Sequence, residues 1–305
     1  MKLLYCGSGW RPIVDFIAAH LPAQHQLQRW DLQTPLPQLM GEVEVLLPSN
    51  ARIDEQVLAA APRLRLIQQP AVGTDSIDLA GCRARGIPVC NSPGMNHVAV
   101  AEAALLLILA LARRLPEAQR AFASRTLGGP LGRELGGRML GILGPGRSGM
   151  ALAERATALG LRVQTLGRAA SADERRAFFG SCDILSVHCP LTPQTRGLIG
   201  AEAVAAMKPG LHLINLARGP VLDRDAVLAG LRAGVIAGLG LDVHWGSPWD
   251  PDDELYRDPR VLALPHLGGS TEESAAAVTA ILLDNLERLA RGALLRHRVD
   301  GLPGG

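Results

Sequence analysis

Lysine is nearly absent from this sequence: of its 31 basic residues, only Lys2 and Lys208 are lysines. The 29 acidic residues leave a net charge of only +2, so neither sign dominates. A protein that binds nucleic acid or an anionic membrane usually carries a large basic field, and this balance provides none. We therefore expect no nucleic acid and no membrane as partners, and any basic pocket has to be local.

Long apolar runs and paired cysteines are also missing. The longest apolar run, residues 103–112, is far shorter than the ~20 residues that cross a bilayer. The five cysteines are scattered, without the spacing of a zinc site or of a disulfide framework. We interpret them as reduced, mostly buried thiols, and we expect a cytoplasmic protein without a metal site. They are Cys6, Cys82, Cys90, Cys182 and Cys189.

The 305 residues, 48% of them hydrophobic, suffice for two ordinary domains with their own cores. Short apolar runs alternate with helix-like stretches, which predicts an α/β fold of two doubly wound parallel sheets. The expected strands are residues 3–5, 43–47, 64–68, 87–90, 139–143, 161–166, 184–188, 211–215, 236–241 and 261–264. The expected helices are residues 12–20, 53–60, 96–114, 149–159, 224–233 and 271–291.

The helix expected at 96–114 is apolar nearly all round, so it has to be covered on several sides. Asn96 is its expected N-cap, and Pro116 marks its end. Residues 117–137 are rich in glycine and arginine and show little periodicity. This composition predicts an arm or linker.

A glycine-rich motif directly follows the strand expected at 139–143. A G-x-G-x-x-G motif on its own is weak, but between a strand and a helix it predicts a dinucleotide-binding loop. The first glycine allows the tight turn, the second lets the backbone approach the pyrophosphate, and the third lets the helix pack closely on the strand. The expected cofactor-binding residues of this loop are Gly144, Gly146, Arg147, Ser148 and Gly149.

The strand expected at 161–166 ends in Gly167 and Arg168, where an NAD site would place an acid for the ribose 2′-hydroxyl. Without that carboxylate nothing repels a 2′-phosphate, and a guanidinium offers two donors to phosphate oxygens. We therefore expect NADP(H) to be the preferred cofactor, with NAD(H) possible. In the alternative interpretation Arg168 is only a solvated loop charge.

Arg218 and His266 each follow an apolar strand, in Asn215-Leu216-Ala217-Arg218-Gly219 and Pro265-His266-Leu267-Gly268-Gly269. An arginine can anchor a carboxylate and a histidine can donate a proton, and the reduction of a 2-keto acid needs both. Taken singly, Arg218 could be a structural ion-pair partner and His266 a core histidine.

The glycine-rich motif, residues 215–219 and residues 265–269 occur in the same order as the signature motifs of the D-isomer-specific 2-hydroxyacid dehydrogenases. Over nearly its whole length the chain resembles this family. Further matching segments are residues 73–78, 86–94, 188–197 and 241–243. The resemblance implies a flavodoxin-like substrate domain at 1–94 and 268–305 and a Rossmann dinucleotide-binding domain at 95–267. It also implies a homodimer formed through the helix and arm at 96–137.

The resemblance implies roles for single residues. Arg218 would hold the substrate carboxylate, the amides around Val72 and Gly73 would bind its other oxygens, and His266 would protonate the keto oxygen. Asp242 would bind the nicotinamide carboxamide, although an acid at a strand end is often only a turn former. The rest of the cofactor groove would be lined by Pro190, Thr195, Leu216, Ala217 and Gly268.

Residues 242–253 resemble the branch that contains many glyoxylate/hydroxypyruvate reductases, where the residue before the first proline is the catalytic glutamate. That residue here is Ser247. Without a carboxylate partner, His266 should titrate near ~6.5, or lower if it is buried. Three outcomes follow: a slow enzyme with an acid-shifted optimum, rescue by Asp250 or Asp252, or a chain that binds cofactor without turnover.

Two functions therefore compete at this stage. The first is an NADPH-dependent reductase of a small 2-keto acid such as glyoxylate or hydroxypyruvate. The second is a dinucleotide-binding sensor or interaction protein. Ser247 at the glutamate position favours this second function, whereas Arg218 and His266 favour the enzyme. A further departure from the family pattern is that residues 168–181 are too few for the usual additional helix and strand.

Overall fold

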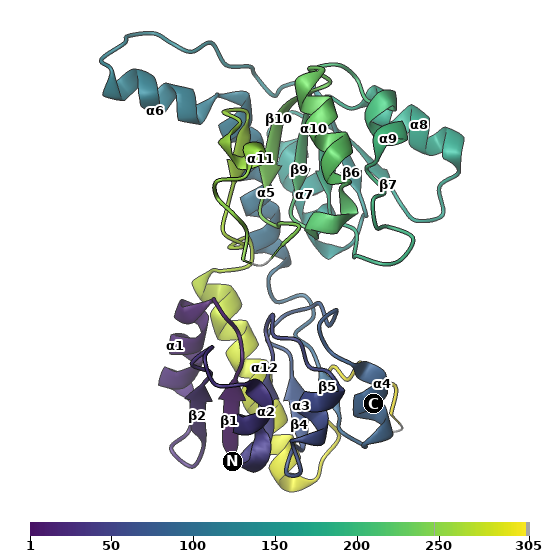
Figure 1. Cartoon of the computed structure of the whole chain (residues 1–305). Helices are drawn as coiled ribbons and strands as arrows, with labels where there is room; N and C mark the ends of the chain where they lie inside the picture. Colours follow the sequence, from purple (N-terminus) through teal and green to yellow (C-terminus); the bar gives the residue numbers. More distant parts are fainter. Residues whose placement is uncertain (247, 303–305) are drawn as a thin grey trace. The chain divides into compact units, whose positions relative to one another are not determined.

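The structure is a computed structural model of the chain, and it describes residues 1–246 and 248–302. The chain divides into two compact units, which we call the first unit (Met1–Met95 with Ser270–Gly305) and the second unit (Asn96–Gly269). The divisions fall after residues 95 and 269, where the sequence had placed them after 94 and 267. Each unit contains its own sheet (Figure 1).

The described residues of the first unit form a five-stranded parallel sheet in the order β2-β1-β3-β4-β5. This is the flavodoxin-like order, as expected. The strands are β1 (Lys2–Tyr5), β2 (Gln26–Arg29), β3 (Val45–Leu47), β4 (Leu66–Gln68) and β5 (Val89–Cys90). The helices are α1 (Arg11–His20), α2 (Leu36–Leu39), η1 (Met40–Glu42), α3 (Glu55–Ala59), α4 (Leu79–Ala84) and α12 (Glu272–Arg291).

Both faces of this sheet are covered, and successive residues of β1 show it. Leu3 and Tyr5 belong to the apolar cluster shared with α1 and α12, whereas Leu4 and Cys6 belong to the cluster on the other face. A strand buried on both sides has a continuous apolar sequence, which is why β1 was recognisable. The edge strand β2 has the polar sequence QLQR and was missed.

The described residues of the second unit form a six-stranded parallel sheet in the order β11-β10-β9-β8-β6-β7. The strands are β6 (Met139–Leu143), β7 (Arg162–Leu166), β8 (Ile184–Val187), β9 (Leu211–Asn215), β10 (Ile236–Leu241) and β11 (Val261–Ala263). The helices are α5 (His97–Ala112), α6 (Leu115–Ala123), α7 (Arg147–Ala158), α8 (Ala172–Ser181), α9 (Ala201–Ala206), η2 (Gly219–Val221), α10 (Arg224–Arg232) and α11 (Glu254–Arg257).

The short segment between β7 and β8 changes the edge of this sheet. It contains the single helix α8 and, among the described residues, no strand, so β7 is the edge strand. Counted within the unit, the order is 2-1-3-4-5-6 instead of the 3-2-1-4-5-6 of a Rossmann sheet. The sheet is doubly wound as expected, and the shortage of residues at 168–181 accounts for the difference.

Two expectations about α5 and the segment after it were wrong: the segment contains a helix, and the side chain of Asn96 does not cap α5. α5 ends at Ala112, before Pro116 as expected, but Pro116 also lies in the first turn of a second helix, α6, where its missing N–H costs no hydrogen bond. Residues 117–137 are therefore partly helical. Asn96 precedes α5, but its side chain makes no capping hydrogen bond. In Figure 1, α6 and the segment after it project from the rest of the second unit.

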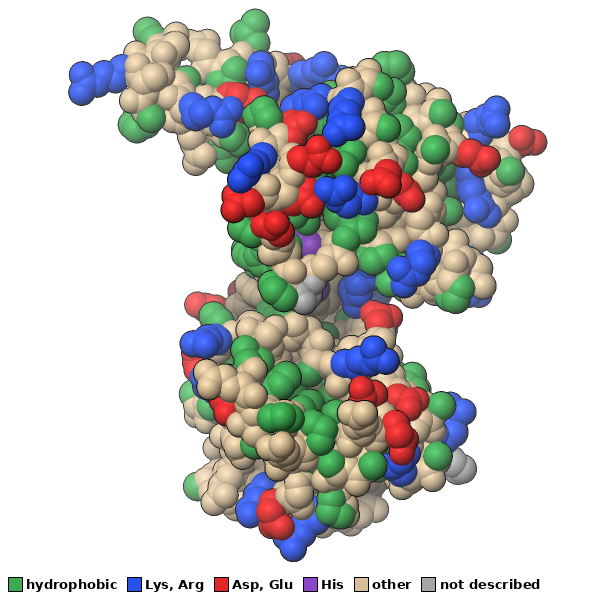
Figure 2. Space-filling view, in the orientation of Figure 1, with side chains coloured by type: hydrophobic (Ala, Val, Ile, Leu, Met, Phe, Trp, Pro, Cys, Tyr) green, Lys and Arg blue, Asp and Glu red, His purple; other side chains and the backbone are tan. Residues whose placement is uncertain are grey.

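The surface and the thiols fit the composition. Acidic and basic side chains are interspersed on the visible face of each unit (Figure 2).

All five cysteines are buried and unpaired, and burial is the main reason that the pKa values of Cys6 and Cys90 rise to about 12. Within the described ranges no helix is long and apolar enough to span a bilayer, and no cluster of three metal-ligating side chains occurs.

Candidate active site

The glycine-rich loop between β6 and α7 gives each glycine a different task. Gly144 has a φ of +93°, and a Cβ there would lie 2.6 Å from the backbone nitrogen of Cys189. A Cβ on Gly149 would lie 2.7 Å from the carbonyl oxygen of Gly144, whereas one on Gly146 would meet nothing within 4 Å. A dinucleotide-binding loop requires a tight turn at its first glycine, open space at its second and close helix packing at its third, and Gly144, Gly146 and Gly149 meet these requirements in turn.

The N-terminus of α7 is open toward this approach. Gly146 is the N-cap residue, and no side chain caps the helix. The N–H groups of Arg147 and Ser148 donate no hydrogen bond within the described chain, so the positive end of the helix dipole is available to an anion. The Ser148 hydroxyl instead lies 3.2 Å from Nδ1 of His188, whose pKa burial lowers to about 4.

Gly167 and Arg168 follow β7 at the same edge of the sheet and are exposed. The N–H of Gly144 donates to the carbonyl of Leu166 (2.9 Å), which places the end of β7 beside the glycine-rich loop. Arg168 makes no ion pair with any described residue. A 2′-phosphate therefore would not have to displace a protein carboxylate from this guanidinium.

The loops after β8 and β9 lie at this edge because the strands are parallel. The Thr195 hydroxyl donates to the carbonyl of Pro190 and accepts from the N–H of Thr192, both at 2.7 Å, so it stabilises its own loop. Leu216 and Ala217 are buried. Of the expected groove residues, Pro190 is exposed and Thr195 is half-buried.

The backbone that carries Arg218 is shaped by Asn215, the fully buried last residue of β9. Its Nδ2 donates to the carbonyl of Arg218 (2.9 Å), and its Oδ1 accepts from the N–H of Ala217 (3.0 Å). The next residue, Gly219, packs so tightly that a Cβ would lie 2.1 Å from the carbonyl oxygen of His244. The Arg218 loop is thus held against the segment after β10.

Asp242, which was expected to bind the nicotinamide carboxamide, forms hydrogen bonds within the protein. Its carboxylate accepts hydrogen bonds from the N–H groups of Leu267 and Gly268, each at 2.8 Å. Burial raises its pKa to about 6, against the lowering effect of these two hydrogen bonds. The structure gives Asp242 the turn-forming role, and a bound carboxamide would have to share the carboxylate with both N–H groups.

His244 holds the other side of the same loop, a contact that the sequence did not reveal. Its Nε2 lies 2.9 Å from the carbonyl oxygen of Leu264, and its Nδ1 lies 2.9 Å from the hydroxyl of Tyr256 in α11. A carbonyl only accepts, so Nε2 carries the proton and Nδ1 accepts from the tyrosine. Trp249 covers the imidazole at a ring-centroid distance of 4.6 Å.

His266 lies between these two supports with a φ of 57°, a left-handed conformation that is unfavourable for a residue with a side chain. Burial, followed by the positive charge of Arg218 and the proximity of His244, lowers its pKa to about 4. The structure thus brings Arg218 close enough to act on His266. With this pKa the imidazole is mostly uncharged at neutral pH.

The residue at the usual glutamate position, Ser247, lies outside the described residues. The two acids considered as substitutes are engaged elsewhere. Asp252 is 76% exposed in an ion pair with Arg257 (2.8 Å), and Asp250 accepts from the N–H of Asp252 (2.9 Å). The described charges that shift the pKa of His266 are both on bases, so these contacts give no support to rescue by either acid.

Val72 and Gly73 belong to the first unit, in the loop after β4. The carbonyl of Val72 accepts from Nδ2 of Asn91 (2.8 Å), and that of Gly73 accepts from Nε2 of Gln69 (2.7 Å). With both carbonyls engaged, the N–H groups of Val72 and Gly73 donate to no other described residue. Two such N–H groups can bind a carboxylate. Gln69 and Asn91 were not identified from the sequence.

Comparison with known proteins places these features in a family. Residues 105–268 match the family described as D-isomer specific 2-hydroxyacid dehydrogenase, NAD binding domain. A glyoxylate reductase of Thermococcus litoralis is 37% identical over 302 residues, covering 90% of this chain and 91% of that protein. A D-3-phosphoglycerate dehydrogenase of Archaeoglobus fulgidus is 33% identical over 268 residues, covering 84% of this chain but only 51% of that longer relative.

Solved structures agree with this relationship. The NADPH-dependent glyoxylate/hydroxypyruvate reductase of Sinorhizobium meliloti, in complex with NADP and malonate, superposes with a TM-score of 0.84 at 28% identity. The superposition covers 98% of this chain and 96% of the other. With the doubly wound sheets, the glycine-rich loop and the Arg218–His266 neighbourhood, these matches show that the chain belongs to the D-isomer-specific 2-hydroxyacid dehydrogenases, a family of nicotinamide-dependent oxidoreductases.

Proposed function

We propose that this protein reduces a small 2-keto acid to the D-2-hydroxy acid with a nicotinamide dinucleotide as hydride donor. The observation that carries the proposal is the proximity of Arg218 to His266 at the sheet edge that also holds the glycine-rich loop. Substrates of the size of glyoxylate or hydroxypyruvate are favoured, because two of the relatives are named reductases of these compounds.

In the proposed reaction the side chains handle charge and the proton. Arg218 would hold the substrate carboxylate through paired N–H donors and polarise the keto oxygen. The N–H groups of Val72 and Gly73 would bind the remaining carboxylate oxygens. His266 would donate a proton to the keto oxygen. The dinucleotide, when bound, supplies the hydride to the keto carbon.

We infer that proton donation is the weak step of the proposed reaction. An imidazole with a pKa of about 4 is almost entirely unprotonated at neutral pH, and general acid catalysis typically contributes ~10²- to 10⁴-fold. A substrate carboxylate beside Arg218 would offset the arginine charge and raise the pKa of His266 in the complex. We therefore propose a slow enzyme with an acid-shifted optimum, in which Ser247, unlike a glutamate, supplies no charge to offset the burial of His266.

NADP(H) is the proposed preferred cofactor, with NAD(H) as an alternative. The support is the exposed Arg168 directly after β7, in place of the acid that would bind a ribose 2′-hydroxyl. Asp242 is proposed to accept a hydrogen bond from the nicotinamide carboxamide. The carboxylate lone pairs that are not used by the N–H groups of Leu267 and Gly268 would be the acceptors.

A homodimer is proposed for the second unit. On α5, Leu106 is 52% exposed and Leu109 is 41% exposed, and Phe122 on α6 is 87% exposed. Apolar side chains this exposed on α5 and on the projecting helix α6 favour coverage by a second copy. Light scattering of the purified chain measures the mass in solution, and a monomeric mass would contradict the dimer.

Buried unpaired thiols are consistent with a cytoplasmic location, which we propose alongside.

The test of the function is NADPH oxidation with glyoxylate, hydroxypyruvate and pyruvate at acidic and neutral pH. Turnover that is faster at acidic pH is expected. The low pKa of His266 keeps one other function open, that of a dinucleotide-binding sensor. Tight NADPH binding without turnover of any of the three acids at either pH would favour the sensor.

A further inference from the structure

A separate hollow lies at the opposite edge of the second unit's sheet. Its volume is about 210 Å³, and its polar lining comes from the segments that immediately precede β6, β8 and β9, and from β9 itself. The polar residues are Arg133, Arg138, Asp183, Lys208 and His212. Because the strands are parallel, this edge holds their amino ends, whereas doubly wound sheets bind dinucleotides at the carboxyl ends. The hollow is therefore not part of the cofactor site.

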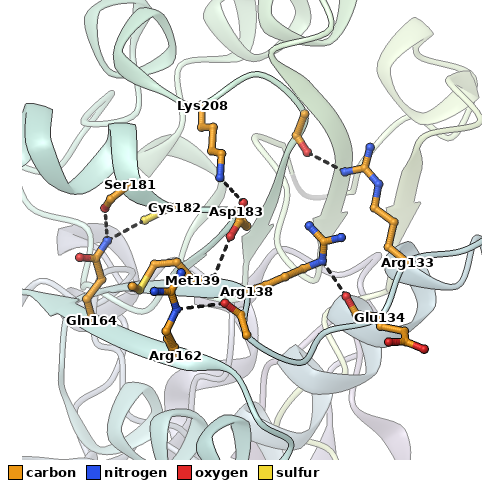
Figure 3. Close-up of polar contacts among 12 residues, drawn as sticks. Arg133, Glu134, Arg138, Met139, Arg162, Gln164, Ser181, Cys182, Asp183 and Lys208 are labelled. Carbon is orange, nitrogen blue, oxygen red and sulfur yellow. Dashed lines mark hydrogen bonds and ion pairs between the residues drawn. The ribbon is translucent and has the colours of Figure 1, made fainter.

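Three cations and one carboxylate meet in this hollow (Figure 3). The carboxylate of Asp183 is already committed, because Oδ1 accepts from Nζ of Lys208 (2.6 Å) and Oδ2 accepts from the N–H of Met139 (2.9 Å). Neither Arg133 nor Arg138 forms an ion pair with a described residue. The hollow thus keeps an excess of positive charge that the protein does not neutralise.

The two guanidinium groups also keep most of their donors. Arg138 donates from Nε to the carbonyl of Glu134 (2.6 Å), and Arg133 makes only a long contact with the carbonyl of Gly210 (3.5 Å). A guanidinium has five N–H donors in a fixed plane, suited to oxygens of phosphate and carboxylate groups. The described residues use one donor of each, so the others can bind a ligand.

Two titratable groups respond to this positive field: Asp183, directly before β8, and His212, in β9. Burial, followed by the charges of Arg133 and Arg138, lowers the pKa of His212 to about 4. Burial raises the pKa of Asp183, but the hydrogen bonds from Lys208 and Met139 and the charges of Lys208 and Arg138 lower it further, so the net shift is downward. An anion in the hollow would oppose this field at His212.

We propose that this hollow binds a small oxyanion with at least two negative charges, either a phosphate group or a compact dicarboxylate. Pockets for drug-sized ligands have volumes of roughly 300–1,000 Å³, so a hollow of about 210 Å³ is too small for a dinucleotide. The proposal concerns a site at the other edge of the sheet from Arg218 and His266, and it does not depend on the proposed function.

The test is NMR of the full chain with isotope-labelled histidine, titrated with inorganic phosphate, malonate or chloride at constant ionic strength. The His212 signal is identified by its loss in His212→Gln. Phosphate or malonate should shift this signal to saturation in the millimolar range and raise the pKa of His212, whereas chloride should not. The anion with the larger effect identifies the preferred chemistry. Binding at the glycine-rich loop or at Arg218 is read separately from His188 and His266.

A double variant gives the matched comparison. Arg133→Gln combined with Arg138→Gln removes the two unpaired charges and should abolish the saturating shift. Arg176→Gln removes one exposed charge on α8, outside the hollow, and should leave the shift intact. A His212 signal that neither anion moves, or that moves equally in the double variant, overturns the proposal. The wild-type titration alone can overturn it, even where the double variant folds poorly.

Discussion

Nε2 of His244 lies 2.9 Å from the carbonyl oxygen of Leu264, two residues before His266. On the other side of His266, Asp242 accepts hydrogen bonds from the next two N–H groups. The segment after β10 thus holds the His266 loop at both ends, and this explains how a residue with a side chain is kept at a φ of 57°. The position of the proton donor depends on the two supports.

His244→Phe should reduce kcat while leaving the KM for the keto acid nearly unchanged, because the variant displaces His266 without touching Arg218. The partly buried carbonyl of Leu264 loses its donor, which should destabilise folding by about 1 kcal/mol. Steady-state kinetics and urea unfolding measure the two effects. Tyr256→Phe is the matched control, since it removes only the contact to Nδ1. An unchanged kcat in His244→Phe would rule out the positioning role.

The rate of keto-acid reduction should fall as pH rises. The required form of His266 is the protonated one, and above its pKa that form decreases tenfold per pH unit, so log kcat/KM should decline from the acidic range through neutrality. In Ser247→Glu a carboxylate would favour the charged imidazole and move this decline to higher pH. Profiles of kcat/KM against pH for both proteins test this, and coinciding profiles would remove the argument about Ser247.

Arg168→Ala should lower kcat/KM for NADPH by roughly 10- to 100-fold, because a hydrogen-bonded contact to a charged group contributes about 1.5–3 kcal/mol. The value for NADH should change little, since NADH has no 2′-phosphate. Arg176→Ala, also an exposed arginine of the second unit, serves as the control for general charge effects. A wild-type preference for NADH would contradict the assignment of Arg168.

Gly146→Ala and Gly149→Ala should separate cofactor binding from folding. The methyl group at 146 meets no protein atom within 4 Å, so stability should be unchanged while NADPH binding weakens. At 149 it would lie 2.7 Å from the carbonyl oxygen of Gly144, so the variant should unfold at a lower temperature. Thermal melts and NADPH titrations measure both. Unweakened NADPH binding in Gly146→Ala would mean that the pyrophosphate does not approach here.

Folding stability should decrease as pH falls from about 6.5 to 4. His188, His212 and His266 have folded pKa values of about 4, below the ~6.5 of an unfolded histidine. The folded chain therefore binds these protons more weakly, and protonation favours the unfolded state, by up to about 1.4 kcal/mol per pH unit and group. Urea unfolding at several pH values measures the slope, which His188→Gln should reduce. A flat profile would show that these histidines are not buried in neutral form.

The buried strands could be predicted from the residue pattern alone, because strands covered on both faces are short and mostly apolar, as β1 and β6 are. The sequence also predicted the glycine-rich loop, since each glycine there is demanded by local backbone geometry. The pattern did not predict β2, because its residues are mostly polar. It also did not predict α6, because a proline directly after a helix usually indicates that the helical segment has ended.

The contacts of the polar side chains, in contrast, depend on the folded arrangement of the strands. Asp242 proved to bind the backbone after His266, and His244 proved to bind the backbone before it, because β10 and β11 run side by side. Arg133 and Lys208 are 75 positions apart, yet both line one hollow. Contacts between residues so distant in sequence leave no periodic pattern, since parallel strands and their connections alone determine which loops meet.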